Sequence, residues 1–336
     1  MTTEDTVVTS RDGRIGRILL NRPRALNALD LPMLRACAAI LETWRNDPHV
    51  HAVVIEGAGD RAFCAGGDIR ALRDAQLSGR RAVADEFFRF EYDLNLAIAT
   101  YPKPYIALID GICMGGGIGL SVHAPYRVAT EHAGFAMPET AIGFFPDIGA
   151  TFLLPRLPGE LGLYLGLTGI RVTGADAVHA GFATHYTPRA RLADLSAALA
   201  RDGVAALAAF DETLPPFSLA PSRAAIDHCF SAETVTEIVR RLQEDGDGWA
   251  QAALKALRTV SPSALHWTLR ALRRGRDLTL PQALDAEFAL TRTSMSHPDF
   301  AEGVRAMVVD KDRTPAWQPA RIEDVEPATI AALFEA

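Results

Sequence analysis

The chain is organised around residues 103–156, KPYIALIDGICMGGGIGLSVHAPYRVATEHAGFAMPETAIGFFPDIGATFLLPR. The apolar run at 105–109 predicts a buried strand, and the glycines at 115–117 open a predicted helix shortly after it. Backbone N–H groups at such a junction can point at an incoming oxygen atom. This junction is therefore a candidate anion or oxyanion site.

Two carboxylates follow in the same stretch, Glu139 and Asp147, eight residues apart. Their neighbours are apolar, namely Phe135, Met137, Phe144 and Phe145. Apolar surroundings disfavour the ionised form of a carboxyl group by desolvation. Such a pair suits general acid–base or nucleophilic chemistry.

A second glycine loop lies upstream, at 62–70, AFCAGGDIR. Gly66 and Gly67 fit a place where backbone must approach a ligand or take a positive φ. Asp68 is a predicted N-cap, with its side chain satisfying the first turn of a helix.

The two glycine loops together carry a family resemblance. The pairing of CAGGDI at 64–69 with GICMGGGIGL at 111–120 resembles the crotonase (enoyl-CoA hydratase/isomerase) superfamily. The run from 137 to 157, MPETAIGFFPDIGATFLLPRL, preceded by EYDLN at 91–95, is similar to one branch of it, the 3-hydroxyisobutyryl-CoA hydrolases. The superfamily motifs cover roughly residues 15–190.

The resemblance implies an acyl-CoA substrate whose thioester oxygen lies between two backbone N–H groups, those of Gly67 and Gly116. It also assigns coenzyme A contacts to Arg24, Ala25 and Leu26, although residue types alone fit an ordinary strand-to-helix turn equally well. Glu91 would contact the acyl end of the substrate. The alternative for Glu91 is a solvated helix glutamate, or one paired with Arg89.

The side chains near the glycine triplet separate hydration from hydrolysis. Hydratases of this superfamily use two glutamates, and Gly119 stands at the first of those positions, so only Glu139 is kept. Asp147 stands where the hydrolase-like branch keeps a carboxylate. The resemblance thus implies hydrolysis of a 3-hydroxyacyl-CoA, 3-hydroxyisobutyryl-CoA of valine breakdown in particular. Glu139 would be nucleophile or general base, and Asp147 would position the water or the substrate hydroxyl.

Two other functions stay open on sequence grounds. One is an enoyl-CoA hydratase or isomerase of the same superfamily, because a single glutamate suffices for some isomerisations. The other is a non-catalytic acyl-CoA-binding homologue, against which the two glycine loops and the carboxylate pair argue.

Charge and hydrophobicity limit the kinds of partner that we expect for this chain. The net charge of −7 argues against a nucleic-acid partner. Residues 105–125 are apolar but interrupted by Asp110 and several glycines, so we expect no membrane span. We expect no metal and no cofactor, coenzyme A being part of the substrate, and a homo-oligomer stays open.

The four cysteines, Cys37, Cys64, Cys113 and Cys229, form no CxxC pair. We interpret them as reduced, buried thiols, with a catalytic role for the two in the glycine loops as the alternative. Residues 1–13 have neither a basic n-region nor an apolar h-region, which predicts a cytoplasmic enzyme.

The fold we expect is an α/β core of repeated β-β-α units over residues 1–205, followed by a mainly helical region over 206–336. Asp12-Gly13 predicts a hairpin turn between the first two strands. A helix is expected at 80–100, with an apolar face formed by Val83, Phe87, Phe90, Leu94, Ala97 and Ile98. Two helices should flank residues 261–263, and a last helix should cover 281–309.

Overall fold

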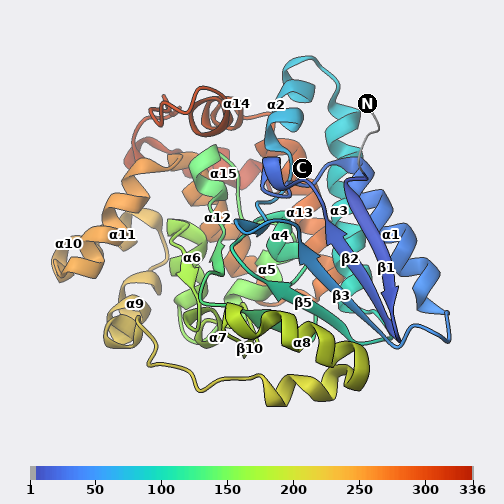
Figure 1. The fold of residues 1–336 in the computed structure, drawn as a ribbon. Helices are drawn as coiled ribbons and strands as arrows, with labels where there is room; N and C mark the ends of the chain where they lie inside the picture. The colour runs from blue at the N-terminus through green and yellow to red at the C-terminus, as the bar shows by residue number, and fades with distance from the viewer. Residues whose placement is uncertain (1–4, 335–336) are drawn as a thin grey trace. The chain divides into compact units, whose positions relative to one another are not determined.

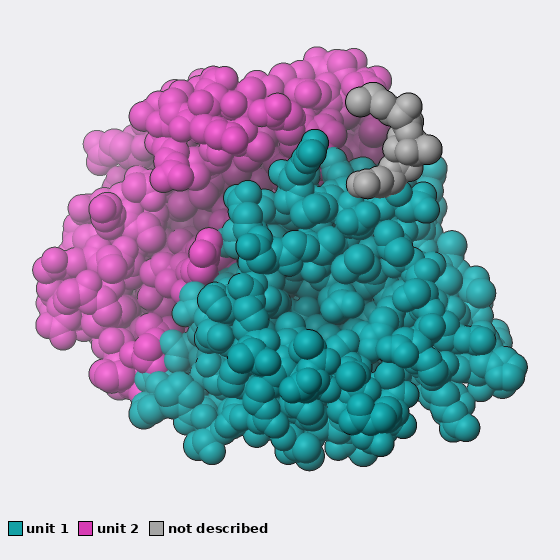
Figure 2. All heavy atoms as spheres, in the orientation of Figure 1, with its two compact units in different colours: residues 1–67, 90–135, 172–217 teal, residues 68–89, 136–171, 218–336 magenta. Residues whose placement is uncertain are grey.

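The chain forms two compact units, each assembled from separate stretches of sequence (Figure 2). The structure is a computed structural model that describes residues 5–334; the outermost residues of the two predicted domains, 1–4 and 335–336, lie outside it. Unit 1 contains residues 5–67, 90–135 and 172–217, and unit 2 contains residues 68–89, 136–171 and 218–334. A core over 1–205 that is separate from 206–336 stays a prediction.

Unit 1 is built on two sheets. The larger has the strand order β1 (Val7–Asp12), β2 (Ile15–Leu20), β3 (Ala52–Gly57), β5 (Tyr105–Ile109), β7 (Tyr126–Ala129) and β10 (His185–Tyr186). The smaller has the order β4 (Ala62–Cys64), β6 (Ile112–Met114), β8 (Gly134–Ala136) and β9 (Val172–Thr173). β1 pairs antiparallel with β2 across the predicted hairpin turn, whereas β2, β3, β5, β7 and β10 are parallel (Figure 1).

The strands alternate between the two sheets along the chain. β3, β5 and β7 each enter the larger sheet, and the strand that follows each of them, β4, β6 or β8, enters the smaller one. α4 (Gly116–Gly119) follows the β5–β6 pair, as α1 (Leu31–Arg45) follows β1–β2. This alternation is the repeated β-β-α pattern expected from the sequence.

The core of unit 1 lies between the larger sheet and the segment 189–209. α8 (Arg189–Asp202) and the 3₁₀ helix η4 (Gly203–Ala209) contribute Leu195, Leu199 and Leu207 to it. The sheet contributes Ile15, Val54, Ile106, Leu108 and Val128. Burying each such side chain stabilises the fold by about 1.5–3 kcal/mol. The unit also holds η1 (Pro23–Ala25) and α7 (Asp176–His179).

Helix α1 starts as the sequence predicts. The Asp30 carboxylate accepts a hydrogen bond from the Met33 N–H at 3.0 Å, and Pro32 occupies the first turn, where no N–H is needed. The helix buries Leu34, Cys37, Leu41 and Trp44.

Unit 2 is helical. Its helices are α2 (Ile69–Leu77), α5 (Ala150–Leu153), α6 (Leu161–Thr168), α9 (Arg223–Phe230), α10 (Val235–Asp245), α11 (Gly248–Thr259), α12 (Pro262–Gly275), α13 (Leu280–Ser294), α14 (Pro298–Val304) and α15 (Pro327–Ala332). Short 3₁₀ turns lie at Glu139–Ile142 (η2), Leu154–Arg156 (η3), Ala220–Ser222 (η5) and Ile322–Asp324 (η7). α12 lies against α5, α6, α10 and α15, and its Trp267 is fully buried.

The prediction of one helix over 281–309 is wrong. α13 ends at Ser294, α14 begins at Pro298, and a π-helical turn covers Arg305–Val309. Proline cannot continue a helix but fits its first turn. His297 caps the new helix by accepting a hydrogen bond from the Asp299 N–H at 3.2 Å.

Helix α3 (Arg81–Ala99) contributes residues 81–89 to unit 2 and residues 90–99 to unit 1. Its predicted apolar face is wrong at Val83, which is 42% exposed. Two polar residues lie on the buried side instead, Glu91 at 3% and Asn95 at 0% exposure.

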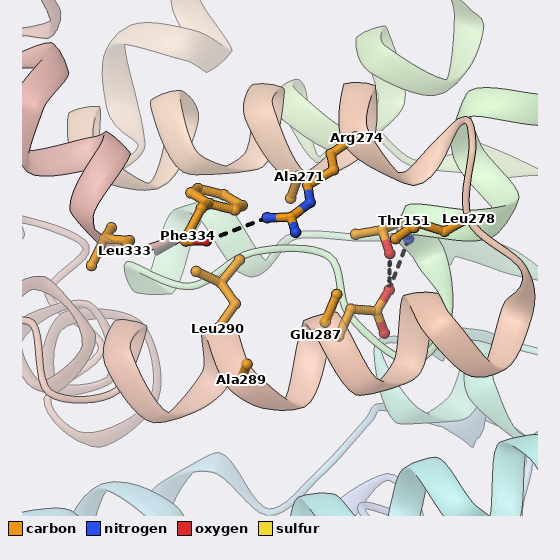
Figure 3. A pocket seen from close by; sticks show the side chains of 10 residues that line it. Thr151, Ala271, Arg274, Leu278, Glu287, Ala289, Leu290, Leu333 and Phe334 are labelled. Carbon is orange, nitrogen blue, oxygen red and sulfur yellow. Dashed lines mark hydrogen bonds between the residues drawn. The ribbon is translucent and has the colours of Figure 1, made fainter. Parts of the chain in front are cut away.

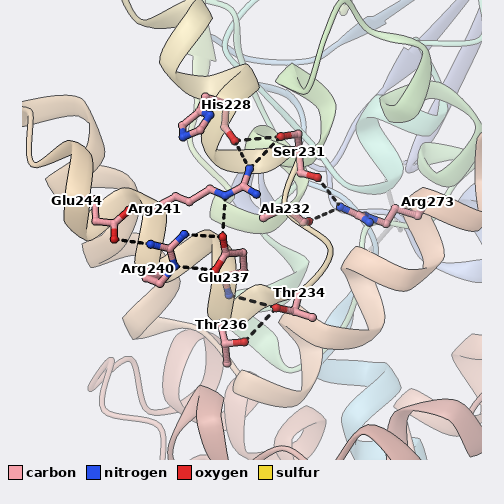
Figure 4. Close-up of polar contacts among 10 residues, drawn as sticks. All are labelled: His228, Ser231, Ala232, Thr234, Thr236, Glu237, Arg240, Arg241, Glu244 and Arg273. Atoms are coloured by element: carbon pink, nitrogen blue, oxygen red, sulfur yellow. Dashed lines mark hydrogen bonds and ion pairs between the residues drawn. The ribbon is translucent and has the colours of Figure 1, made fainter.

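A polar network ties α9, α10 and α12 together in unit 2 (Figure 4). Glu237 accepts hydrogen bonds from both Arg240 and Arg241, and these lower its pKa to about 2. Arg241 also donates to the His228 carbonyl at 2.7 Å. On the α12 side, Arg273 donates to the Ser231 and Ala232 carbonyls. The network therefore has a structural explanation, the joining of three helices.

Candidate active site

The first glycine loop follows β4. Gly66 adopts φ +103°, a conformation that glycine tolerates at little cost. The Leu29 N–H donates to the Gly66 carbonyl at 2.8 Å, so the loop is tied to the start of α1 in unit 1. Asp68 caps α2 as predicted, since its carboxylate accepts from the Ala71 N–H at 3.3 Å.

The second glycine loop lies beside the first within unit 1. A Cβ atom added to Gly66 would lie 3.1 Å from the Met114 carbonyl oxygen and 3.5 Å from the Gly116 nitrogen. Within residues 5–334, neither Gly67 nor Gly116 donates its N–H to a protein acceptor. The two predicted oxyanion donors thus come from adjacent loops.

Both loop cysteines serve packing. Cys64 and Cys113 are fully buried free thiols, and a Cβ on Gly117 would overlap the Cys64 carbonyl. Burial raises the pKa of Cys64 to about 12 and that of Cys113 well above its usual value. The thiolate is the reactive form, so this environment disfavours a catalytic thiol at either position.

Glu91 lies directly against the second glycine loop. A Cβ on Gly116 would overlap Glu91 Oε1 and would lie 3.4 Å from Glu91 Cδ. The reading of Glu91 as a solvated residue is wrong, since it is 3% exposed. Arg89 instead pairs with Asp285 at 3.4 Å in unit 2 and stacks over Phe288. A buried carboxylate therefore stands next to a predicted oxyanion donor.

The predicted coenzyme A contact segment forms a hydrogen-bonded turn in unit 1. Leu26 and Asn27 have φ +53° and +55°, and the buried Asn27 side chain donates to the Ala58 and Ala62 carbonyls at 3.0 and 2.9 Å. Arg24 and Leu26 line a pocket of about 230 Å³, and residues 58–62 form another part of its wall. Both Arg24 and Ala25 are exposed to solvent. This geometry leaves Arg24 and Leu26 accessible to a ligand.

Unit 2 holds both predicted catalytic carboxylates. Glu139 begins η2 and is 7% exposed, and Asp147 is 5% exposed. Phe144 and Phe145, between them in sequence, stack at 4.7 Å, and Phe144 also packs against Phe88 and Phe300. The predicted apolar surroundings are therefore present.

The C-terminal helices fix the segment that carries Glu139. Gly143 ends η2 with φ +65°, and a Cβ there would overlap the Asp299 backbone. Asp299 is itself held by Ser261, whose hydroxyl donates to it at 2.5 Å, and by the Gln318 N–H at 2.8 Å. The Trp267 indole N–H donates to the Phe144 carbonyl at 3.3 Å.

Comparison with known proteins places this chain in a family. The sequence model described as enoyl-CoA hydratase/isomerase matches residues 15–334. The chain belongs to the enoyl-CoA hydratase/isomerase family.

Several members of this family align with this chain over nearly its whole length. The chain is 46% identical over 340 residues to "3-hydroxyisobutyryl-CoA hydrolase, mitochondrial" of Xenopus laevis, covering 97% of this chain and 87% of that one. A structure titled as a carnitinyl-CoA dehydratase from Mycobacterium thermoresistibile aligns with a TM-score of 0.95 at 41% identity, covering 98% and 96% of the two chains. One titled as an enoyl-CoA hydratase from Rhodobacter sphaeroides gives 0.93 at 43%, covering 98% and 97%. These structures confirm the predicted fold.

The sequence patterns did not indicate a role for two buried polar residues, Asn95 and Glu287. Asn95 lies one helical turn after Glu91, and within the described residues its side-chain amide makes no hydrogen bond. The sequence signal for Asn95 was its spacing, because a residue four positions after Glu91 in a helix lies on the same face as Glu91. Glu287 is 1% exposed and contacts the segment after Asp147, 138 residues away in sequence, so no local pattern indicates it.

The described residues contain no cluster of three histidine, cysteine, aspartate or glutamate side chains that could hold a metal ion. Among residues 5–334, no helix has both the length and the apolar character of a membrane span.

Proposed function

We propose that this chain hydrolyses the thioester bond of 3-hydroxyacyl-CoA substrates, 3-hydroxyisobutyryl-CoA in particular. The observation that carries the proposal is which carboxylates the chain has. Glu139 and Asp147 are both present and buried, whereas the position of the second hydratase glutamate is Gly119, a buried glycine at the end of α4. The name of the Xenopus laevis relative supports the same reaction.

The oxyanion donors in this proposal are the N–H groups of Gly67 and Gly116. The thioester oxygen gains negative charge when the carbonyl carbon is attacked, and hydrogen bonds to that oxygen strengthen as the charge develops. Each donor contributes about 3 kcal/mol to stabilising the transition state. Arg24, Ala25 and Leu26 would contact coenzyme A, and Glu91 the acyl end.

Glu139 carries the central role, by one of two routes. As a general base it would take a proton from water, which adds to the carbonyl carbon; as a nucleophile it would form a mixed anhydride that water then cleaves. Either route consumes one water, breaks the C–S bond and returns a proton to the coenzyme A sulfur. Asp147 would hold the water or the 3-hydroxyl group.

Single turnover in H₂¹⁸O detects the anhydride route when water cleaves the anhydride at the Glu139 carboxyl carbon. Only the anhydride route can place ¹⁸O in the Glu139 carboxylate, and mass spectrometry of the peptide that contains Glu139 would detect it. The general-base route leaves that peptide unlabelled and labels the released acid alone, and so does attack of water on the acyl carbon of the anhydride, so a labelled peptide is the outcome that establishes the anhydride route.

A panel of acyl-CoAs, with and without a 3-hydroxyl group, tests the function itself through release of free thiol. We expect fast release from 3-hydroxyisobutyryl-CoA, slower release from isobutyryl-CoA, and poor hydration of crotonyl-CoA. The names given to the two solved structures favour the second candidate, a hydratase or dehydratase. Hydration of crotonyl-CoA faster than any thiol release would establish it. Tight binding without turnover would instead identify a non-catalytic acyl-CoA-binding protein.

We further propose that the enzyme acts in valine breakdown in the cytoplasm. Four free cysteines in the described chain suit a reducing compartment. The Xenopus laevis relative, by contrast, is named as mitochondrial. Cell fractionation with an antibody against the full-length protein would decide between these compartments, and light scattering after gel filtration would test assembly into a homo-oligomer.

A further inference from the structure

The backbone turn that carries Asp147 is strained. The Asp147 carbonyl accepts a hydrogen bond from the Ala150 N–H at 2.9 Å, and the two residues between them, Ile148 and Gly149, have φ +59° and +82°. This is a turn with both central residues in the left-handed region, which glycine and asparagine favour. A β-branched residue such as isoleucine rarely adopts it, so the surrounding structure must hold the turn in place.

The helix after this turn lacks a capping side chain of its own. α5 begins at Ala150, and its N-cap is Gly149, which has no side chain to accept a hydrogen bond. The first N–H groups of a helix need acceptors from elsewhere.

Glu287 of α13 supplies those acceptors. Its Oε2 accepts from the Gly149 N–H at 2.7 Å, and its Oε1 accepts from the Thr151 N–H at 2.9 Å and from the Thr151 hydroxyl at 2.6 Å. Figure 3 shows the Glu287 carboxylate directed at Thr151. All of these residues belong to unit 2.

We propose that Glu287 is a positioning residue for the reaction, which caps α5 from a distant helix and thereby holds the strained turn that presents Asp147. This inference rests on the proposed function insofar as it assigns Asp147 a role in hydrolysis. It also gives the C-terminal helical region a task, since α13 reaches the segment that follows a predicted catalytic residue.

The surroundings of Glu287 agree with this task. Burial, the largest cause, and the neighbouring Asp147 carboxylate raise the pKa of Glu287 to about 8, while its hydrogen bonds to Thr151 and Gly149 lower it. The side chain also lines a cavity of about 110 Å³, whose other walls include Leu290, Phe334 and Arg274 (Figure 3). A buried carboxyl group beside another carboxylate is costly to keep, and its hydrogen bonds to the turn and to α5 explain why it is there.

The first test is Glu287→Gln, assayed by thiol release from 3-hydroxyisobutyryl-CoA. Glutamine keeps the size but faces an N–H group with its own NH₂, so one of the hydrogen bonds is lost. We expect kcat to fall about 10- to 100-fold with KM within about twofold of wild type, because Asp147 is displaced rather than removed. Asp285→Asn is the matched control, an exposed carboxylate on the same helix, and should behave as wild type.

The second test is chemical rescue of Glu287→Ala by formate. The cavity already reaches position 287, so removal of the side chain leaves space for a small carboxylate that can accept the same hydrogen bonds. Formate should restore several-fold activity to Glu287→Ala and none to Glu287→Gln, whose side chain fills the space. A residue that mattered for packing alone would not be rescued by an anion.

A third measurement, hydrogen exchange, tests the positioning role without any substrate. Hydrogen exchange of the 147–153 amides should quicken in Glu287→Gln and stay at the wild-type rate in Asp285→Asn. Absence of thiol release from the wild type would remove the proposed function alone. Wild-type kcat in Glu287→Gln, or unchanged exchange at 147–153, would overturn the positioning role.

Discussion

Replacing Glu287 with glutamine should change how the stability of the protein depends on pH. The pKa of Glu287 is raised from 4.5 to about 8, with burial as the largest cause. Between these values the folded state binds a proton that the unfolded state has released. The stabilising contribution of Glu287 is therefore full below pH 4.5, falls as pH rises, and is lost above pH 8.

The size of this effect follows from the two pKa values. Because the pKa of Glu287 is about 8 in the folded protein instead of 4.5, ionising this carboxyl group in the folded state costs on the order of 5 kcal/mol. Glutamine does not titrate, so Glu287→Gln lacks this dependence. The free energy of unfolding of wild type minus that of Glu287→Gln should fall by about 4 kcal/mol between pH 4.5 and 9.

Urea unfolding from pH 4.5 to pH 9, followed by tryptophan fluorescence, measures this difference. Trp267 is a buried reporter in the same unit. Titrating groups that do not interact with Glu287 cancel in the subtraction, whereas Asp147, whose carboxylate interacts with Glu287, does not. Asp285→Asn should stay parallel to wild type. A wild-type-minus-variant difference that is flat across this range would refute the reasoning about Glu287.

Three further predictions concern other residues of the site. Gly116→Ala places a Cβ against the Glu91 carboxylate, so we expect thiol release to fall at least about tenfold and stability to fall by about 1–3 kcal/mol. Asp147→Asn should lower kcat, with a larger loss on substrates that carry the 3-hydroxyl than on those that lack it. Ser261→Ala removes both the cap of α12 and a hydrogen bond to the buried Asp299, so urea unfolding should show a loss of about 2–3 kcal/mol.

Each of these predictions has a matched control. Gly248→Ala adds a Cβ where nothing lies within 4 Å, and should leave thiol release unchanged. Ser222→Ala removes an N-cap serine that makes no capping hydrogen bond, and should change stability by less than about 0.5 kcal/mol. Equal losses in Gly116→Ala and Gly248→Ala, or in Ser261→Ala and Ser222→Ala, would contradict these assignments. If Asp147→Asn lowers kcat equally on substrates with and without the 3-hydroxyl group, Asp147 does not hold that hydroxyl group.

Local patterns in the sequence predicted most of the elements. The Asp12-Gly13 turn, the caps at Asp30 and Asp68 and the glycine loops each depend on residues close together in the chain. The same reasoning failed at 281–309, where the apolar pattern continues past Pro298 although proline starts a new helix. Helical periodicity also led to the wrong expectation that Val83 is buried. Periodicity identifies the apolar face of a helix but not how far along the helix neighbouring segments pack against that face.

The site was predictable only in part. Residue identities and the family resemblance indicated Gly67, Gly116, Glu139 and Asp147. That the Glu91 carboxylate lies against Gly116 depends on how α3 packs, which no local pattern encodes. The hydrogen bonds of Glu287 to Gly149 and Thr151 join positions more than 130 residues apart, so they emerge only from the folded structure.

The central claim, that Glu139 carries hydrolysis of the thioester, is tested most directly by Glu139→Gln with 3-hydroxyisobutyryl-CoA. Glutamine keeps the size of the side chain but cannot act as base or nucleophile. We expect thiol release to fall about 10²-fold or more while binding of the coenzyme A ester stays similar, with Glu42→Gln, an exposed glutamate on α1, at wild-type rate. Near-normal thiol release by Glu139→Gln would contradict the account.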